Sequence, residues 1–521
     1  MKRENALAAA GGGDNWDFVV VGGGATGLGV AIDAAARGYQ TLLLEQSDLG
    51  KGTSSRSTKL VHGGVRYLQQ GNVALVIEAL KERGLLRANA PHLVRNLSFV
   101  VPNYEWWEGP FYGTGLKIYD LLAGRHGFGR SRVLSRERTL QLLPTIERKG
   151  LNGGVIYYDG QFDDARLCVA MARTAAGQGA TIVNYMRVTD LLKEHGQVVG
   201  VRVRDEESAP PVEREIRAGV VINATGPWAD DLRRMDDPST PRLVRHSQGV
   251  HIVLDRDFLP GESAIMVPRT DDKRVLFAIP WLDRVIVGTT DTPVDRPALE
   301  PVALDEEVEF LLEHAGRYLE RDPRREDVLS IFVGLRPLVG GDDDDIATAS
   351  LSRDHILLIS DSGLVTITGG KWTTYRKMAE DTVDQSATLA GLDDRPCVTR
   401  TLHLHGYHAR AERFGELAHY GSDAPELRDL LRGDRRYGEP LHKSFPIRAG
   451  EVVWAARHEL ARTVDDFLSR RTRALLLDAR AAMEVAPTVA ALLAEELGRD
   501  SDWARAQVEE FQELAGNYLP R

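Results

Sequence analysis

The segment that decides the fold runs from Asp17 to Glu45. It begins with the apolar run DFVVV at 17–21 and continues through the glycine turn GGGATG at 22–27. An alanine-rich stretch at 30–36 follows, and the run TLLLE at 41–45 closes the segment. Apolar run, tight turn, helical stretch and second apolar run predict a strand–helix–strand unit.

The glycines of this unit match the G-x-G-x-x-G pattern of dinucleotide sites. Gly22 permits the turn, Gly24 lets the backbone approach a pyrophosphate, and Gly27 lets the helix pack closely on the strand. The helix N-terminus offers free N–H groups and a positive dipole end to phosphates. Glu45 lies 18 residues after Gly27, where an acid binds the adenosine ribose hydroxyls. Such an acid favours NAD or FAD over NADP.

Two later segments favour FAD. VVINATGPW at 220–228 and GLVTITGGK at 363–371 are apolar runs that enter small-residue turns, and 372–382 has helical composition. Taken alone, either segment is compatible with an ordinary strand-to-helix turn. A nucleotide domain built from three separated pieces of chain is typical of flavoproteins, whose last helix directs its N-terminus at the flavin. We therefore expect FAD as the cofactor.

Composition sets the broad class. The chain has 521 residues, enough for two to four domains at about 150 residues each. Its 43% hydrophobic and 27% charged residues exclude a disordered or fibrous chain. The net charge of −11 argues against nucleic-acid binding. Cys168 and Cys397 form no C-x-x-C pair, which excludes a disulfide framework and a cysteine-ligated cluster and fits a reducing compartment.

The apolar runs of the sequence are too short for a signal peptide or a membrane-spanning helix. Residues 1–15 contain Glu4 and only a short apolar stretch at 6–10, so we predict a disordered leader rather than a signal peptide. No run of about 18 apolar residues is present, so no membrane-spanning helix is expected. Binding at a membrane surface stays open.

The sequence resembles the FAD-dependent glycerol-3-phosphate dehydrogenases in several segments. The most specific segments are TSSRSTKLVHGGVRYL at 53–68 and GGKWTTYR at 369–376. The other matching segments are NATGPW at 223–228, IPW at 279–281, GTTD at 288–291, GLRPL at 334–338 and TVDDFLSRRTR at 463–473. They occur in the family order, so the resemblance covers nearly the whole chain.

The resemblance implies an α/β fold with three parts. A Rossmann-like FAD-binding domain is assembled from the discontinuous segments 16–85, 160–235 and 350–395. A mixed-sheet α+β substrate domain comes from 86–159 and 236–349, and a helical C-terminal domain from 398–521.

The resemblance also implies an activity. It is the oxidation of sn-glycerol 3-phosphate to dihydroxyacetone phosphate by hydride transfer from C2 to FAD, with electrons passed to a membrane quinone. It further implies a cytoplasmic enzyme held peripherally at the inner face of the cell membrane, with a homodimer as a candidate assembly. Three alternatives stay open: a glycerol-3-phosphate oxidase that makes hydrogen peroxide, a related FAD amine oxidase, and a non-catalytic FAD-binding protein.

The substrate carries a phosphate dianion, so its site needs concentrated positive charge. By position in the family motifs, the candidates are Arg66 with Tyr67, Arg336, Arg353 and Lys371. Guanidinium groups bind phosphate bidentately, and lysine acts as a point charge. Each of these cations is also compatible with a solvated or carboxylate-paired role.

Alcohol oxidation also needs a base near neutral pKa, which points to histidine. We predict His62 as the base, with Arg66 beside it and His251 as substrate-site support and alternative base. One departure stands next to His251: the family reads Lys-Gly-Ser-His or Lys-Gly-Thr-His, whereas residues 248–251 read Gln-Gly-Val-His.

The resemblance assigns a larger set to the cofactor: Gly22, Gly24, Gly27, Glu45, Ser54, Ser55, Lys59, Ala224, Thr225, Gly226, Gly370 and Lys371. No metal site is expected. The string His403, His405 and His408 is interpreted as alternating strand histidines, and the acidic run at 342–345 as a solvated loop.

The C-terminal region carries two further patterns. Apolar positions between 452 and 468 follow helical spacing, which predicts a core-facing helix. The cluster of Arg470, Arg471 and Arg473 suits either contact with anionic lipid head groups or charge at a helix C-terminus.

Overall fold

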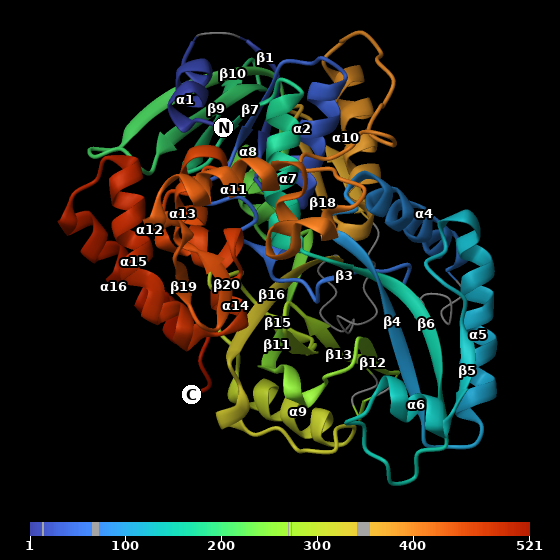
Figure 1. Cartoon of the computed structure of the whole chain (residues 1–521). Helices are drawn as coiled ribbons and strands as arrows, with labels where there is room; N and C mark the ends of the chain where they lie inside the picture. The colour runs from blue at the N-terminus through green and yellow to red at the C-terminus, as the bar shows by residue number, and fades with distance from the viewer. Residues whose placement is uncertain (13–14, 65–71, 269, 272–273, 341–354) are drawn as a thin grey trace.

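The computed structural model describes residues 1–12, 15–64, 72–268, 270–271, 274–340 and 355–521. Two large sheets and a C-terminal group of helices form the molecule (Figure 1). The C-terminal helices lie to one side of the second sheet, and α5 lies at the opposite outer edge.

The first sheet carries the predicted strand–helix–strand unit. Its strand order is β17-β18-β10-β1-β2-β7, and β8 and β9 extend it through β10. The strands from β18 to β7 are parallel, and Val21 of β1 pairs with both Asn223 of β10 and Leu44 of β2. The strands are β1 (Trp16–Val21), β2 (Thr41–Leu44), β7 (Thr181–Val183), β8 (Met186–Glu194), β9 (Gln197–Asp205), β10 (Val212–Asn223), β17 (His355–Ile359) and β18 (Val365–Gly369).

Helices from distant parts of the chain cover this sheet. α2 (Ala25–Ala36) packs against both α7 (Asp164–Gly177) and α10 (Tyr375–Leu389). α2 can approach α10 closely because a Cβ at Gly29 would lie only 2.8 Å from the ring of Tyr375. The remaining helices of this part are α4 (Val73–Asn89), α8 (Ala229–Asp236) and the 3-10 turns η1 (Thr53–Ser55), η3 (Gly226–Trp228) and η7 (Trp372–Thr374).

The second sheet is mixed, as expected for the substrate domain. Its order is β15-β11-β14-β13-β12-β4-β6-β3, with β16 on β11 and β5 on β6. β12 runs parallel to β4, and the other pairs are antiparallel. The strands are β3 (Leu60–Val61), β4 (Val94–Asn103), β5 (Arg132–Ser135), β6 (Gly153–Phe162), β11 (Val244–Asp255), β12 (Ser263–Val267), β13 (Leu276–Trp281), β14 (Arg284–Gly288), β15 (Thr292–Val294) and β16 (Ser330–Val339).

The helices beside this sheet are α5 (Glu108–Ala123), α6 (Arg136–Leu142) and α9 (Asp305–Gly316). Short 3-10 turns accompany them: η2 (Gly124–His126), η4 (Arg256–Phe258) and η5 (Arg325–Asp327).

The C-terminal region is helical, as predicted, with one small hairpin. Its buried core includes Val253, Trp281 and Phe332 of the second sheet, so it packs directly on the substrate domain. The elements are η8 (Ala411–Asp423), α11 (Ala424–Gly433), α12 (Arg435–Gly438), β19 (Pro440–His442), β20 (Phe445–Arg448), α13 (Ala449–His458), the π-helical η9 (Asp466–Arg471), α14 (Ala474–Leu477), α15 (Ala479–Leu497) and α16 (Ser501–Gly516).

The prediction of a disordered leader is wrong over most of residues 1–15. Residues Arg3–Ala10 form the helix α1. Arg3 is buried and pairs with Asp205 at 2.7 Å. The alanine-rich segment has high helix propensity, and this ion pair attaches it to the first sheet.

Two short stretches that the prediction assigns to the FAD-binding domain lie in the second sheet. β3 pairs with the end of β6, so 60–61 and 160–162 are part of that sheet. The predicted helix at 452–468 is also interrupted: α13 ends at His458, and Leu460 has a φ of 58°.

The three histidines at 403, 405 and 408 lie outside any strand, so the strand interpretation is wrong. His403 stacks on Tyr407, and His405 bonds Asp423 at 2.8 Å. Among the described residues, no group of three or more His, Cys, Asp or Glu side chains is placed to hold a metal ion. The acidic run at 342–345 lies outside the described residues.

Candidate active site

A cavity of about 490 Å³ opens where the parallel strands β1, β2, β10 and β18 end. This is the edge at which α/β sheets bind dinucleotides. Nine residues of the predicted cofactor set line it: Gly22, Gly24, Glu45, Ser54, Ala224, Thr225, Gly226, Gly370 and Lys371.

The glycines of the turn make contacts that a larger residue would block. Gly22 has a φ of +112°, and a Cβ there would lie 2.6 Å from the carbonyl oxygen of Ala224. A Cβ on Gly27 would lie 1.9 Å from the carbonyl oxygen of Gly22. Gly27, predicted as a cofactor residue, is outside the cavity lining and lies where α2 packs closely on the turn after β1.

Glu45 stands at the end of β2 with both carboxylate oxygens oriented by the backbone. Oε2 accepts the N–H of Gly23 at 2.7 Å, and Oε1 accepts the N–H of Ser47 at 2.8 Å. Burial raises the pKa of this carboxyl. Each oxygen has a second acceptor position, so Glu45 can still accept a ribose hydroxyl.

The loop after β2 is tied to the other two pieces of the site. Ser54 Oγ accepts the N–H of Ala25 at 2.9 Å, and the Ser54 carbonyl accepts the indole N–H of Trp372 at 2.9 Å. Thr53 Oγ donates to the carbonyl of Leu335 at 2.6 Å. The glycine cradle, the oriented acid and the N-terminus of α2 together fit a dinucleotide such as FAD.

His251 belongs to a second polar group, on β11. It is 2% exposed, its Nε2 lies 2.9 Å from Thr58 Oγ1, and its ring stacks on Phe332. Burial, together with the charges of Arg336 and Lys59, lowers the pKa of His251 well below its usual range. His251 is therefore a neutral imidazole at neutral pH.

Arg336 lies on the neighbouring strand β16. Its Nη1 donates to Asp291 Oδ1 at 3.0 Å, and its Nη2 donates to Thr289 Oγ1 at 3.1 Å and to the Thr290 carbonyl at 2.9 Å. The next residue, Pro337, lines the dinucleotide cavity. Arg336 is thus an oriented cation one residue before the cavity lining, and its own side chain is outside that lining.

The departure at 248–251 falls on the opposite face of β11 from His251. Gln248 donates to Glu307 Oε2 at 2.6 Å, and Val250 is fully buried in the core of the second sheet. Side chains of a strand alternate between its faces. The side chains that differ from the family pattern therefore lie on the face of β11 away from the side chain of His251.

Besides Gly27, two predicted cofactor residues lie outside the cavity lining, Lys59 and Ser55. Lys59 is fully buried, and its Nζ donates to Asp164 at 2.8 Å and to the Ser55 carbonyl at 2.6 Å. Burial lowers the pKa of Lys59. Neither Lys59 nor Ser55 lines the cavity. The hydrogen bond from Lys59 to the Ser55 carbonyl instead holds the loop after β2 from outside the cavity lining.

His62 lies against the Gly-Gly-Lys segment. Its carbonyl accepts Thr373 Oγ1 at 3.4 Å, just after Lys371 and Trp372. Arg66, Tyr67 and Arg353 lie outside the described residues. The structure therefore places the segment of His62 and the segment of Lys371 side by side.

Sequence reasoning did not name part of the lining. Met186, Arg187 and Val188 of β8 form one wall, and no motif marks them. Trp228, Pro337 and Trp372 also line the cavity, and their position within family motifs was the signal that could have identified them.

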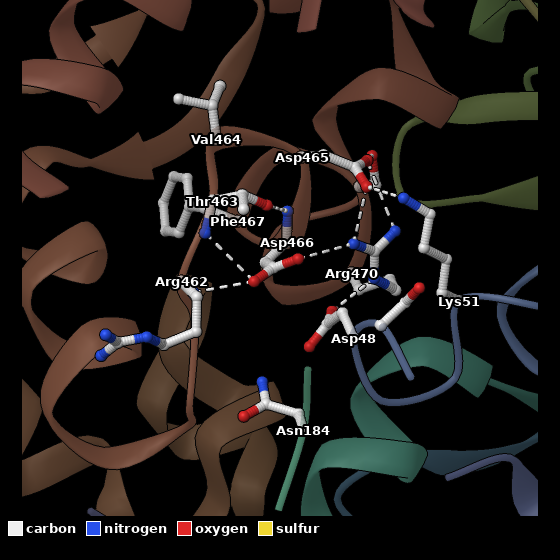
Figure 2. Close-up of polar contacts among 12 residues, drawn as sticks. Asp48, Lys51, Asn184, Arg462, Thr463, Val464, Asp465, Asp466, Phe467 and Arg470 are labelled. Atoms are coloured by element: carbon white, nitrogen blue, oxygen red, sulfur yellow. Dashed lines mark hydrogen bonds and ion pairs between the residues drawn. The ribbon is translucent and has the colours of Figure 1, made fainter. Parts of the chain in front are cut away.

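The arginine cluster at 470–473 is buried, which excludes the lipid-contact alternative. Arg470 pairs with Asp48, Asp465 and Asp466, Arg471 pairs with Asp48, and Arg473 pairs with Asp163 at 3.0 Å. Figure 2 shows the contacts of Arg470. These side chains are internal ion-pair partners.

Two family models match this chain. The family model "FAD dependent oxidoreductase" matches residues 17–376, and "C-terminal domain of alpha-glycerophosphate oxidase" matches 364–504. The mitochondrial glycerol-3-phosphate dehydrogenase of Mus musculus is 42% identical over 97% of this chain and 73% of its own length. That of Arabidopsis thaliana is 39% identical over 98% of this chain and 88% of its own.

Among solved structures, glycerol-3-phosphate dehydrogenase from Bacillus halodurans, complexed with FAD, superposes with a TM-score of 0.81. It is 30% identical, and the match covers 99% of this chain and 98% of that one. L-alpha-glycerophosphate oxidase from Mycoplasma pneumoniae, at 16% identity and a TM-score of 0.55, shares the fold over 74% of this chain and 98% of its own.

Fold and site together define a flavoprotein of the FAD-dependent oxidoreductase class, with FAD as its cofactor. Within that class, the chain belongs to the family of FAD-dependent glycerol-3-phosphate dehydrogenases.

Proposed function

We propose that this chain oxidises sn-glycerol 3-phosphate to dihydroxyacetone phosphate. The observation that supports this most directly is the dinucleotide cavity, which Lys371 lines, together with a neutral His251 and an oriented Arg336 on the neighbouring strands β11 and β16. FAD, when bound there, accepts the two electrons removed from the alcohol.

The cations of the site bind the phosphate of the substrate. Arg336, held by Asp291, and Lys371, on the cavity wall, supply positive charge from the described residues. Arg66 and Arg353 complete this set of cations in the proposal, and Tyr67 is a further proposed substrate-binding residue. A dianion needs several cations, because each fork or point charge neutralises only part of its charge.

His62 is the proposed base, and His251 is the alternative. The lowered pKa of His251 keeps its imidazole neutral but also makes it a weaker proton acceptor, so the shift favours positioning of the substrate over the base role.

Stopped-flow flavin reduction of His62→Asn and His251→Asn without oxygen decides between them. Loss of the base slows this half-reaction by about 10² to 10⁴-fold. An unchanged rate in His62→Asn with a slowed rate in His251→Asn would transfer the role to His251.

Substrate class is tested on the yellow holoenzyme without air. Glycerol 3-phosphate is expected to bleach the flavin, whereas glycine and sarcosine are expected to leave it oxidised. Bleaching by the amines instead would favour the amine-oxidase alternative, and no bleaching by any of the three would favour a non-catalytic FAD protein.

The proposed electron acceptor is a membrane quinone. Oxygen is the alternative, and the same cavity would serve an oxidase. Reduction of a quinone analogue in the absence of peroxide formation supports the dehydrogenase, and stoichiometric hydrogen peroxide supports the oxidase.

We further propose peripheral contact with the inner face of the cell membrane, through α5. Among the described residues, no helix is both long and apolar enough to cross a bilayer. Trp107, directly before α5, and Phe111, Ile118 and Leu121 within it follow helical spacing and are all exposed, Leu121 to 79%. An apolar stripe open to solvent is typical of an interfacial helix, and α5 lies at the outer edge of the molecule (Figure 1).

Flotation with anionic liposomes tests this contact. The double variant Trp107→Ser/Phe111→Ser is expected to reduce the floated fraction at least threefold. Leu389→Ser, an exposed apolar residue at the end of α10, is the matched control and should float as the unchanged protein does. If the protein without substitutions stays wholly in the aqueous fraction, the result would contradict membrane contact.

A further inference from the structure

The loop after β2 forms one wall of the dinucleotide cavity. Its residues 45–46 and 50–54 line that wall, among them Lys51. None of the described residues beyond Trp372 lines the cavity, so the C-terminal region has no direct contact with it. The loop is nevertheless held by C-terminal side chains.

Asp48 attaches the loop to the C-terminal region. Its fully buried carboxylate accepts Arg470 Nε, and it accepts Arg471 Nη1 and Nη2 at 2.7 Å each. Burial opposes ionisation, but the charges of Arg471 and Arg470 outweigh it and lower the pKa of Asp48. The anchor is therefore an ionised carboxylate between two guanidinium groups.

Arg470 connects this anchor to Lys51. Its Nη2 donates to Asp465 Oδ2 at 2.8 Å and to Asp466 Oδ1 at 3.0 Å. Lys51 Nζ donates to the same Asp465 oxygen at 3.1 Å. Figure 2 shows Arg470 between the loop residues Asp48 and Lys51 and the carboxylates of 465 and 466.

The charges of this network balance. Glu300 adds contacts to Lys51 at 3.7 Å and to Arg56 at 2.5 Å. Removing one member of a buried ionic group leaves an uncompensated charge, which strongly disfavours the native arrangement. The network consists of four carboxylates and four cations, which are Asp48, Glu300, Asp465 and Asp466 on one side and Lys51, Arg56, Arg470 and Arg471 on the other.

We propose that Arg470 and Asp465 are positioning residues for bound FAD. From outside the cavity they fix the loop at 48–54, and so the C-terminal region determines how tightly the cofactor is held. Ser54 and Lys51 carry the effect to the cavity, because both lie on its wall and both depend on the position of this loop.

The test measures FAD release on dilution of the holoenzyme, followed by flavin fluorescence. Arg470→Met is expected to raise the FAD dissociation constant at least tenfold. Arg470→Lys is expected to give an intermediate value, because lysine keeps the charge but does not reproduce the planar fork. Asp423→Asn is the matched control: it removes the ion pair of Asp423 with Arg173 of α7 without touching the loop, and should change the constant less than twofold.

A second readout reports on the loop itself. Trypsin is expected to cleave after Lys51 in the Arg470→Met holoenzyme but not in the control. Equal FAD release from Arg470→Met and Asp423→Asn, or no new cleavage at the loop, would overturn the proposal.

If Arg470→Met does not fold, a pair of milder variants decides. Asp465→Asn is expected to weaken FAD binding in the protein without other substitutions and to weaken it less in a Lys51→Met background, because the contact with Lys51 carries part of its effect. Additive effects of the two substitutions would overturn the positioning role.

Discussion

At the scale of single residues, the contact of Gly27 with the Gly22 carbonyl shows how little space the turn allows. Because a Cβ would lie 1.9 Å from that oxygen, Gly27→Ala must displace α2 from β1. We expect a loss of about 1–3 kcal/mol in the free energy of unfolding and weaker FAD retention. Urea unfolding and FAD release measure the two effects. Gly177→Ala, with open space at its Cβ position, is the control.

The departure from the family pattern at 248–251 also belongs to the residue scale. Val250 packs in the core of the second sheet, and Gln248 bonds Glu307 on the face away from His251. We expect Gln248→Lys to pair with Glu307 and to change the rate of flavin reduction by glycerol 3-phosphate less than threefold. A tenfold or larger change, measured by stopped flow, would show that the two faces of β11 are coupled.

At the scale of elements, α7 and α13 are joined by a buried ion pair. Glu459, directly after α13, accepts Arg166 Nη1 and Nη2 of α7 at 2.7 Å each. Burial alone would raise the pKa of Glu459, but the charge and hydrogen bonds of Arg166 lower it to about 2.

Because the pKa of Glu459 is lowered, the free energy of unfolding is predicted to decrease as the pH falls. The ionised form stabilises the native state above the ordinary pKa of 4.5 and loses this effect as pH falls toward about 2. The shift corresponds to about 3 kcal/mol. Chemical unfolding between pH 6 and pH 3 should show a smaller acid dependence in Glu459→Gln than in the unchanged protein. Equal slopes would contradict the assignment.

The helix α1 gives a second prediction at this scale. Arg3 pairs with Asp205 from a helix that was expected to be disordered. Because a buried ion pair is broken, Arg3→Gln is expected to lower the free energy of unfolding by about 3 kcal/mol. Lys2→Gln, one residue earlier and exposed, should leave the unfolding midpoint unchanged.

For the molecule as a whole, the features that could be predicted from the sequence are those set by local constraints on the backbone. The glycines at 22, 24 and 27 restrict the backbone so strongly that strand, turn, helix and cofactor edge follow from them. The partner of a buried charge is a tertiary property. Asp164 lies 105 residues from Lys59, and Asp48 lies 422 residues from Arg470, so no spacing pattern pointed to either pair.

The placement of β18 has a consequence for synthesis of the chain. This strand, at Val365–Gly369, pairs with β10, which pairs with β1 near the start of the chain. The nucleotide sheet therefore stays incomplete on the ribosome until the chain has been made as far as Gly369. A nascent chain halted before that point should capture no flavin, however long it waits.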